Sequence, residues 1–322
     1  MKALRHLLSM DDLDRDDIDY LLDLTQRYVE VSERKIPRIP ALRGKTVALV
    51  FYEDSTRTRI SFATAASRLS ADTLGFDVKR SSANKGESLR DTIETISAMG
   101  IHGIVLRHFG AGAPWRVCEW TDASVINGGD GRNQHPTQSL ADLFTARQHL
   151  GELDGKRVAI VGDIKNSRVA RSNAIGFAKM GAEVVFVAPQ TLLPVSLEGW
   201  PVSVTHNLDE VVDEIDICYL LRMQLERQHD APVPTMREFH HEFGLTAARA
   251  DRLKEGALIM HPGPMNRDVE IAGEVADRPN AVITEQVANG VAVRMAVLFV
   301  LIGSRLDLVE ESSLADQESA VA

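Results

Sequence analysis

The chain has 322 residues, of which 44% are hydrophobic and 25% charged, and these proportions exclude collagen-like, low-complexity and wholly disordered proteins. At roughly 150 residues per domain, this length suggests about two domains. The formal net charge of −10 argues against a protein that binds nucleic acid regardless of its sequence.

The first half of the chain alternates short β-branched runs with longer amphipathic stretches. Strands are predicted at 45–53, 75–78, 103–107 and 124–127, and helices at about 61–70, 89–99 and 136–150. The last of these helices begins at Pro136, and proline is well suited to the first helical position.

The same alternation starts afresh after Gly151. Strands are predicted at 157–161, 183–188, 216–221 and 257–260, and helices at about 169–180, 209–214, 246–253 and 285–302. Strand–helix alternation of this kind predicts parallel sheets flanked by helices. The predicted fold class is therefore α/β, with two domains, each an open parallel sheet flanked by helices, joined by interdomain helices.

The renewed start of the alternation near residue 151 indicates a boundary between two domains. Residues 1–135 plus 290–310 are expected to form the first domain and residues 151–289 the second. The helix over 136–150 is expected to link them. The tail over 311–322 is acidic and rich in small residues, so we expect it to be flexible.

Localisation is predicted from what the sequence lacks. The most apolar stretch, Met295 to Gly303, is far shorter than the ~20 residues that cross a bilayer, so no membrane span is expected. The N-terminus carries acidic residues where a signal peptide would need its apolar centre. Cys118 and Cys218 are too few for a disulfide framework, which fits a reducing compartment. We therefore expect a soluble cytoplasmic protein.

The segment from Asp54 to Arg59 (DSTRTR) has the features of an anion-binding loop. It follows a predicted buried strand and precedes a helix, whose first N–H groups and positive dipole end suit a phosphate. Three hydroxyls and two guanidiniums within this segment add further donors. Helix capping by Ser55 or Thr56 is the alternative, but capping needs one hydroxyl and gives no reason for two arginines.

Three motifs resemble those of the transcarbamoylase family. The run 55–59 (STRTR) resembles the carbamoyl-phosphate signature, and 135–138 (HPTQ) resembles the second motif. The run 261–264 (HPGP) resembles the third motif, in the form found in aspartate transcarbamoylase catalytic chains. The match extends in the same order along nearly the whole chain. The resemblance implies that the first domain binds carbamoyl phosphate, that the second binds aspartate, and that N-carbamoyl-L-aspartate is formed on the way to pyrimidines.

The resemblance also assigns residues to the substrates. Phosphate would be bound by Ser55, Thr56, Arg57, Thr58 and Arg107. His135, together with Arg57 and Thr58, would polarise the carbonyl oxygen. Gln138 and the backbone carbonyls of Gly263 and Pro264 would accept hydrogen bonds from the carbamoyl NH₂. Two arginines and a glutamine that follow strands of the second sheet suit the two carboxylates of aspartate: Arg168, Arg222 and Gln224.

The polar segment 81–87 (SSANKGE) completes this implied site. In the family, such a loop carries a serine and a lysine into the active site of a neighbouring subunit. Lys85 is the lysine, and either Ser81, which the four-residue spacing favours, or Ser82 is the serine. The resemblance thus implies a homotrimer with sites at subunit interfaces. Regulatory chains or a dihydroorotase as further partners, and nucleotide feedback, stay open. No nucleic-acid partner is expected.

No cofactor and no metal are expected for this chemistry. His240, His241 and His261 lack a carboxylate or cysteine pattern typical of metal ligands, so they are expected to be structural. A nicotinamide dehydrogenase is disfavoured, because the run 162–167 (GDIKNS) lacks the G-x-G-x-x-G spacing.

Two alternatives within the family remain. An ornithine transcarbamoylase would share the phosphate half. However, Arg222 and Gln224 do not suit a cationic side chain, and Gly263 stands where that family usually has a cysteine. An inactive paralogue that serves as a scaffold would be expected to lose charged residues from the pocket, and every motif residue is present.

Overall fold

The structure, a computed structural model, describes residues 4–77, 87–224 and 233–303. By their contacts, the residues divide into two compact units. Of the described residues, unit 1 comprises 4–8, 16–77, 87–130 and 291–303, and unit 2 comprises 9–15, 131–224 and 233–290. The helix expected to link two domains lies within unit 2 in this division.

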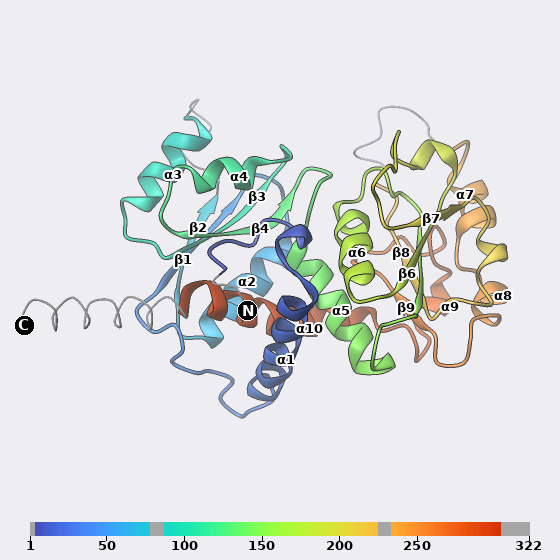
Figure 1. Ribbon diagram of the computed structural model, residues 1–322, viewed down its shortest axis with the longest axis horizontal. Helices are drawn as coiled ribbons and strands as arrows, with labels where there is room; N and C mark the ends of the chain where they lie inside the picture. Colours follow the sequence, from blue (N-terminus) through green and yellow to red (C-terminus); the bar gives the residue numbers. More distant parts are fainter. Residues whose placement is uncertain (1–3, 78–86, 225–232, 304–322) are drawn as a thin grey trace, which may run out of the picture. The chain divides into compact units, whose positions relative to one another are not determined.

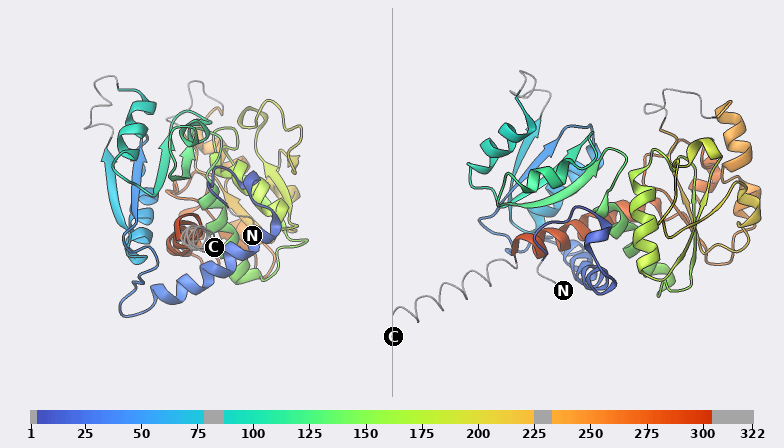
Figure 2. Two further views of the ribbon diagram at one scale, coloured as in Figure 1. Left: turned by 60° about the vertical axis from the view of Figure 1, so that its left-hand side comes forward. Right: turned by 45° about the horizontal axis from the view of Figure 1, so that its top comes forward.

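Unit 1 contains a four-stranded parallel sheet in the order β2-β1-β3-β4 (Figure 1). Its strands are β1 (Thr46–Phe51), β2 (Asp72–Asp77), β3 (Gly103–His108) and β4 (Ser124–Asp130). Its helices are α1 (Arg15–Ser32), α2 (Thr56–Arg68), α3 (Leu89–Ser97), α4 (Ala113–Cys118) and the end of α10 (Ile283–Leu298). Figures 1 and 2 show α3 and α4 on one face of the sheet and α2 and α10 on the other.

The core of unit 1 follows from the two-residue period of its strands. Successive side chains of a strand point to opposite faces of the sheet. Ala48 and Val50 of β1 therefore share one face, where they belong to a buried cluster with Ile93 and Ile96 of α3. Burying a side chain such as Val50 or Ile93 contributes about 1.5–3 kcal/mol, so this cluster stabilises the packing of α3 on the sheet.

Unit 2 contains a five-stranded parallel sheet in the order β7-β6-β5-β8-β9. Its strands are β5 (Arg157–Val161), β6 (Glu183–Val187), β7 (Ser203–Thr205), β8 (Ile217–Leu220) and β9 (Leu258–Met260). Its helices are α5 (Pro136–Leu150), α6 (Arg168–Lys179), α7 (Met236–Phe243), α8 (Ala247–Ala250), α9 (Gly273–Ala276) and the start of α10. Short 3₁₀ turns lie at Met10–Asp12, Gln190–Leu192 and Leu208–Glu210. Figure 1 shows α5 and α6 on one face of this sheet and α8 and α9 on the other.

The α/β class and the two parallel sheets predicted from the sequence are confirmed. Every predicted strand is present, with ends that shift by at most three residues. The helix predicted from residue 61 begins at Thr56, and the helix predicted over 246–253 shrinks to Ala247–Ala250. The helices and strands absent from the sequence prediction are α1, α4, α7, α9 and β7.

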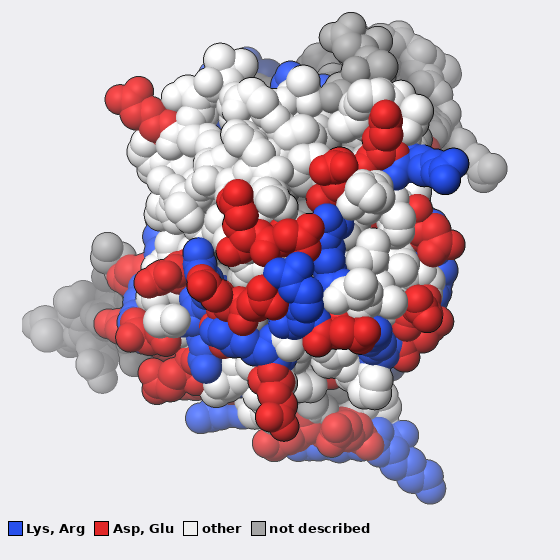
Figure 3. All heavy atoms as spheres, turned by 90° about the vertical axis from the view of Figure 1, so that its right-hand side faces the viewer, with Lys and Arg blue, Asp and Glu red and all other residues white. Residues whose placement is uncertain are grey.

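The helix predicted over 209–214 is wrong, because only the 3₁₀ turn Leu208–Glu210 forms there. Side chains fix this segment in its irregular form: Asp209 pairs with Arg249 at 2.8 Å and with Arg252 at 2.6 Å. The guanidinium of Arg249 lowers the pKa of Asp209. The face of the molecule drawn in Figure 3 carries many acidic side chains next to basic ones.

One helix of the described part of the chain, Ile283–Gly303 including a final π-turn, is long and apolar enough to cross a membrane, with a mean hydropathy of 1.7. The apolar stretch expected from the sequence, Met295 to Gly303, is less than half as long as this helix. The helix is 72% buried over its most apolar window. In unit 1, Leu301 O accepts from Ser124 Oγ at 2.7 Å, and Phe299 packs edge-on against Tyr28. These contacts are those of a core helix.

Candidate active site

The strand order of unit 1 reverses direction between β1 and β3. The chain passes from β1 to β2 on one side and then returns to β3 on the other side. In open parallel sheets, ligands bind outside the carboxyl ends of strands at such a reversal. Phe51 at the end of β1 pairs with Arg107 at the end of β3. The predicted anion loop and Arg107 therefore come from the two strands that flank the reversal.

The start of α2 has the properties of an anion-binding helix end. Ser55 is its N-cap residue and makes no side-chain capping hydrogen bond, so the alternative of ordinary capping by Ser55 is wrong. The first-turn N–H groups and the positive end of the helix dipole then favour an anion. Thr58 is buried, whereas Thr56 and Arg57 are exposed.

Arg59, the second arginine of the predicted loop, lies beside strand β2. Its Nη2 lies 3.3 Å from the point that a Cβ on Gly75 would occupy. Gly75 belongs to β2, so the absence of a side chain there accommodates the Arg59 guanidinium.

Arg107 is held by two acceptors of unit 1. Its Nη1 donates to the backbone carbonyl of Gly128 at 3.1 Å, and its Nε lies 3.4 Å from Oε2 of Glu53. The side chains of Arg107 and Glu53 are 15% and 20% exposed, which leaves both only partly solvated. Glu53 is a residue that the sequence analysis did not single out; its place directly after β1, beside the loop, was the available signal.

Unit 2 repeats this arrangement in its own sheet. The strand order reverses between β5 and β8. Arg168 begins α6 after β5, while Arg222 and Gln224 follow β8. Gly162 has φ +117°, and a Cβ there would lie 3.0 Å from the carbonyl oxygen of Leu221. Glycine thus lets the two loops that carry these residues approach each other closely.

A buried carboxylate, Asp163, joins these two loops. Its Oδ2 accepts from the backbone N of Gln224 at 3.2 Å, and its Oδ1 accepts from Nδ2 of Asn166 at 2.8 Å. Arg168 is 4% exposed and Arg222 is partly buried. This role of Asp163 was not predicted from the sequence, because its contact with Gln224 joins positions 61 residues apart.

His135 and Gln138 lie at the start of α5, also in unit 2. The backbone N of His135 donates to Oγ of Ser172 at 2.8 Å, and Ser172 Oγ donates to Oε1 of Gln134 at 2.6 Å. Nε2 of Gln138 donates to Oδ1 of Asp142 at 2.9 Å. These contacts fix the backbone at His135 and the side chain of Gln138.

The loop 261–264 is shaped by His261. Nδ1 of His261 accepts from the backbone N of Gly263 at 2.8 Å, so the ring hydrogen is on Nε2, 3.2 Å from Oε1 of the buried Glu270. Gly263 has φ +61°, and the peptide bond between Gly263 and Pro264 is cis.

Within residues 4–77, 87–224 and 233–303, no group of three or more His, Cys, Asp and Glu side chains could bind a metal. Ser81, Ser82 and Lys85 lie outside the described residues.

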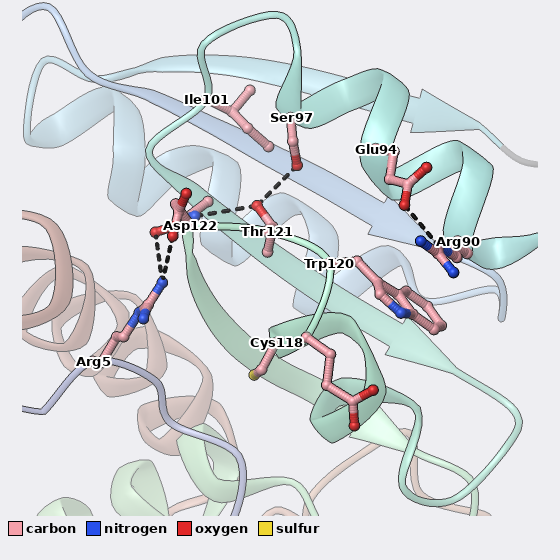
Figure 4. A pocket seen from close by; sticks show the side chains of 11 residues that line it. Arg5, Arg90, Glu94, Ser97, Ile101, Cys118, Trp120, Thr121 and Asp122 are labelled. Atoms are coloured by element: carbon pink, nitrogen blue, oxygen red, sulfur yellow. Dashed lines mark hydrogen bonds and ion pairs between the residues drawn. The ribbon is translucent and has the colours of Figure 1, made fainter.

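A cavity of about 520 Å³ in unit 1 contains none of the predicted site residues (Figure 4). Its charged and hydroxyl groups bond to one another. Arg5 pairs with Asp122 at 3.0 Å, and Ser97 Oγ donates to Thr121 Oγ1 at 2.8 Å. The candidate site therefore consists of the strand-end loops of each unit and not of this cavity.

Two family models match the chain in succession. Residues 5–148 match the carbamoyl-P binding domain of aspartate/ornithine carbamoyltransferase, and residues 154–301 match its Asp/Orn binding domain. The aspartate carbamoyltransferase catalytic subunit of Acidothermus cellulolyticus is 55% identical over 300 residues, which are 93% of each chain. That of Thermobifida fusca is 52% identical over 303 residues, covering 94% of this chain and 97% of its relative.

Solved structures agree with these matches. The aspartate transcarbamoylase of Trypanosoma cruzi in complex with carbamoyl aspartate and phosphate has a TM-score of 0.83 at 30% identity, covering 92% of this chain and 96% of that one. The catalytic subunit of the M. jannaschii enzyme has a TM-score of 0.81 at 38% identity, covering 94% and 99%. The chain therefore belongs to the aspartate/ornithine carbamoyltransferase family, among its aspartate carbamoyltransferase catalytic subunits.

Proposed function

We propose that the chain transfers the carbamoyl group of carbamoyl phosphate to the α-amino group of L-aspartate, giving N-carbamoyl-L-aspartate and phosphate. The observation that carries this proposal is the 55% identity to an aspartate carbamoyltransferase catalytic subunit over 93% of both chains. The cationic strand ends of the two sheets support it, because both substrates are anions. The reaction would serve pyrimidine biosynthesis.

The phosphate half of the substrate is assigned to unit 1. Ser55, Thr56, Arg57, Thr58 and Arg107 would bind the phosphate dianion. The uncapped first turn of α2 supports this assignment, since its N–H groups add donors that need no reorganisation. Glu53 and the Gly128 carbonyl would orient the Arg107 guanidinium.

The residues proposed to bind the carbamoyl group and aspartate come mostly from unit 2. His135, with Arg57 and Thr58, would donate to the carbonyl oxygen as charge develops on it. Gln138 Oε1 and the backbone oxygens of Gly263 and Pro264 would accept from the NH₂. The aspartate carboxylates would be bound by Arg168, Arg222 and Gln224, with Lys85 completing the set.

The chemistry these residues support is a direct displacement. The amino group of aspartate attacks the carbonyl carbon, the C–O bond to phosphate breaks, and the leaving phosphate takes the amine proton. Positioning and electrostatic stabilisation supply the acceleration, without a covalent enzyme intermediate. Arg57, Thr58, Arg107, His135 and Lys85 are the residues expected to contact the reacting groups.

The experiment is carbamoylation of L-aspartate by the purified chain alone, at saturating carbamoyl phosphate and with L-ornithine in parallel. Activity with aspartate only is expected, and it would also make a regulatory chain or dihydroorotase dispensable. Activity with ornithine would overturn the assignment of the second substrate. No activity with either substrate would overturn the proposed function for the isolated chain and favour an inactive scaffold.

We further propose a homotrimer in the cytoplasm, in which Lys85 and Ser81 serve the neighbouring subunit. The family supports the trimer. The chain has only two cysteines, Cys118 and Cys218, and they form no disulfide, which supports a reducing compartment. Lys85→Ala and Arg57→Ala trimers should each be strongly impaired, and mixed trimers reassembled from both chains should regain activity. Inactive mixed trimers would place the whole site within one chain.

A further inference from the structure

Four side chains donate hydrogen bonds to the carboxylate of Asp142 in α5 of unit 2. Oδ1 accepts from Nε2 of Gln138 and from Nε2 of Gln286, each at 2.9 Å. Oδ2 accepts from Oη of Tyr219 at 2.7 Å and from Nδ2 of Asn173 at 2.9 Å. The side chain is fully buried. Two donors on each oxygen use the full acceptor capacity of an ionised carboxylate.

This arrangement fixes the orientation of the Gln138 amide. Three of the four donors are amide nitrogens, which cannot accept a proton, so they match the ionised form of Asp142. Burial raises the pKa of Asp142, and the hydrogen bonds from Tyr219 and the three amides oppose that rise. Because an ionised carboxylate only accepts, the nitrogen of Gln138 faces Asp142 and Oε1 faces the other way.

A second connection leads from Asp142 to the loop 261–264. Gln286 donates to Asp142 through Nε2 and accepts through Oε1 from the backbone N of His261 at 3.0 Å. His261 in turn accepts from the backbone N of Gly263. One carboxylate therefore orients both Gln138 and, through one side chain, the first residue of the loop.

We propose that Asp142 is a positioning residue for recognition of the carbamoyl group. It sets the direction of the three oxygens that accept from the NH₂, namely Oε1 of Gln138 and the backbone oxygens of Gly263 and Pro264. This inference rests on the proposed function, which assigns those oxygens to the carbamoyl group. Asp142 itself does not contact the substrate; it acts through Gln138 and Gln286.

The test compares ligands that differ in the NH₂ group. Acetyl phosphate carries a methyl group in its place, and inorganic phosphate lacks the acyl group altogether. The wild-type chain should bind carbamoyl phosphate more tightly than acetyl phosphate, as measured by calorimetry. Asp142→Asn replaces one acceptor oxygen by a donor, which leaves buried donors unpaired and turns the Gln138 amide. Its affinity for carbamoyl phosphate should fall about 10-fold or more, with the affinity for inorganic phosphate within about 2-fold of wild type.

Tyr219→Phe is the matched control. It removes a donor from the same carboxylate but on Oδ2, away from Gln138 and Gln286. It should lower the thermal unfolding midpoint while keeping the preference for carbamoyl over acetyl phosphate. Gln286→Leu breaks the connection from Asp142 to His261 but keeps the hydrogen bond between Gln138 and Asp142, so it should lose part of the preference. If Asp142→Asn does not fold, the ligand preference of Gln286→Leu tests the proposal in its place.

The outcomes separate this inference from the proposed function. A selective loss of carbamoyl phosphate affinity supports the role of Asp142. Equal weakening of all three ligands, or an unchanged preference in Asp142→Asn and Gln286→Leu, overturns it while the function stands. A wild-type chain that neither prefers carbamoyl phosphate nor carbamoylates aspartate overturns both.

Discussion

Arg57 and Arg59 are two residues apart on α2, yet only Arg57 is expected to face the reacting carbonyl. Arg57→Ala removes a cation whose attraction grows as charge develops on the oxygen. We expect turnover to fall about 10²-fold or more, on the scale of losing one oxyanion donor. Steady-state kinetics with both substrates saturating measures this change.

Arg59→Ala is the control for this prediction, because the Arg59 guanidinium lies beside Gly75 of β2. It removes the same charge from the same helix and should retain turnover within a few-fold. A near-wild-type turnover for Arg57→Ala, or an equal loss for both variants, would contradict the role of Arg57. The subunit assembly of both variants should be checked in parallel.

Asp163 offers a second prediction, because its carboxylate joins the loops that carry Arg168 and Gln224. In Asp163→Asn, the amide nitrogen cannot accept, so a buried N–H of Gln224 or Asn166 loses its partner. The KM for L-aspartate should rise about 10-fold, and the affinity for inorganic phosphate should stay within about 2-fold. Asp209→Asn, on the surface of the same unit, should change neither value. A phosphate affinity that falls as much as that for aspartate would refute a local role.

Among the elements, β1 begins beside a titratable group. The backbone N of Thr46 donates to Nδ1 of His102 at 3.2 Å. Burial, with a smaller contribution from Lys45, lowers the pKa of His102 from 6.5. Since the folded-state pKa is the lower one, the unfolded chain binds more protons below about pH 6.5. Stability contributed by neutral His102 is therefore present above that pH and lost as the pH falls.

The lowered pKa of His102 gives a prediction for the pH dependence of the stability of unit 1. The thermal unfolding midpoint of His102→Asn should depend less on pH between 7.5 and 5 than that of wild type, because Asn can accept from Thr46 without titrating. His241→Asn, at a highly exposed histidine, should follow the wild-type profile. Identical slopes for wild type and His102→Asn would show that the Thr46 hydrogen bond does not govern this dependence.

How far the elements were predictable depends on their length and surroundings. The strands follow from β-branched runs whose burial matches the pattern, as in β5 and β6. Helix α1 carries Ile18, Leu21 and Leu22 at helical spacing, so the sequence contained a signal that the prediction did not use. Helices of four to eight residues that were not predicted, such as α4 and α9, are too short for a period to emerge.

The candidate site was predictable where it forms motifs and not where it depends on distant contacts. The loops at Ser55 and His135 stand out as short runs with defined chemistry. The groups that orient site residues do not, because Glu53, Ser172 and Asp163 contact partners that lie far away in the sequence. Asp142 is an exception in part: it lies four residues after Gln138, where helical neighbours meet.

At the scale of the whole molecule, the proposed site residues divide between two units with separate cores. Phosphate-binding candidates such as Arg57 and Arg107 belong to unit 1, whereas His135, Gln138 and the loop 261–264 belong to unit 2. A ligand therefore stabilises whichever units it contacts. At 100 times its dissociation constant, the gain is about 2.7 kcal/mol.

Hydrogen exchange measured unit by unit can test this division. Inorganic phosphate should protect amides near residues 52–58 and 103–108 and leave unit 2 unchanged. Carbamoyl phosphate should in addition protect 135–138 and 261–264, because its carbonyl oxygen and NH₂ have their proposed partners there. Acetyl phosphate, which keeps the carbonyl but lacks the NH₂, should protect these two segments less. Equal protection of unit 2 by inorganic phosphate would show that the phosphate, and not the carbamoyl group, makes these contacts.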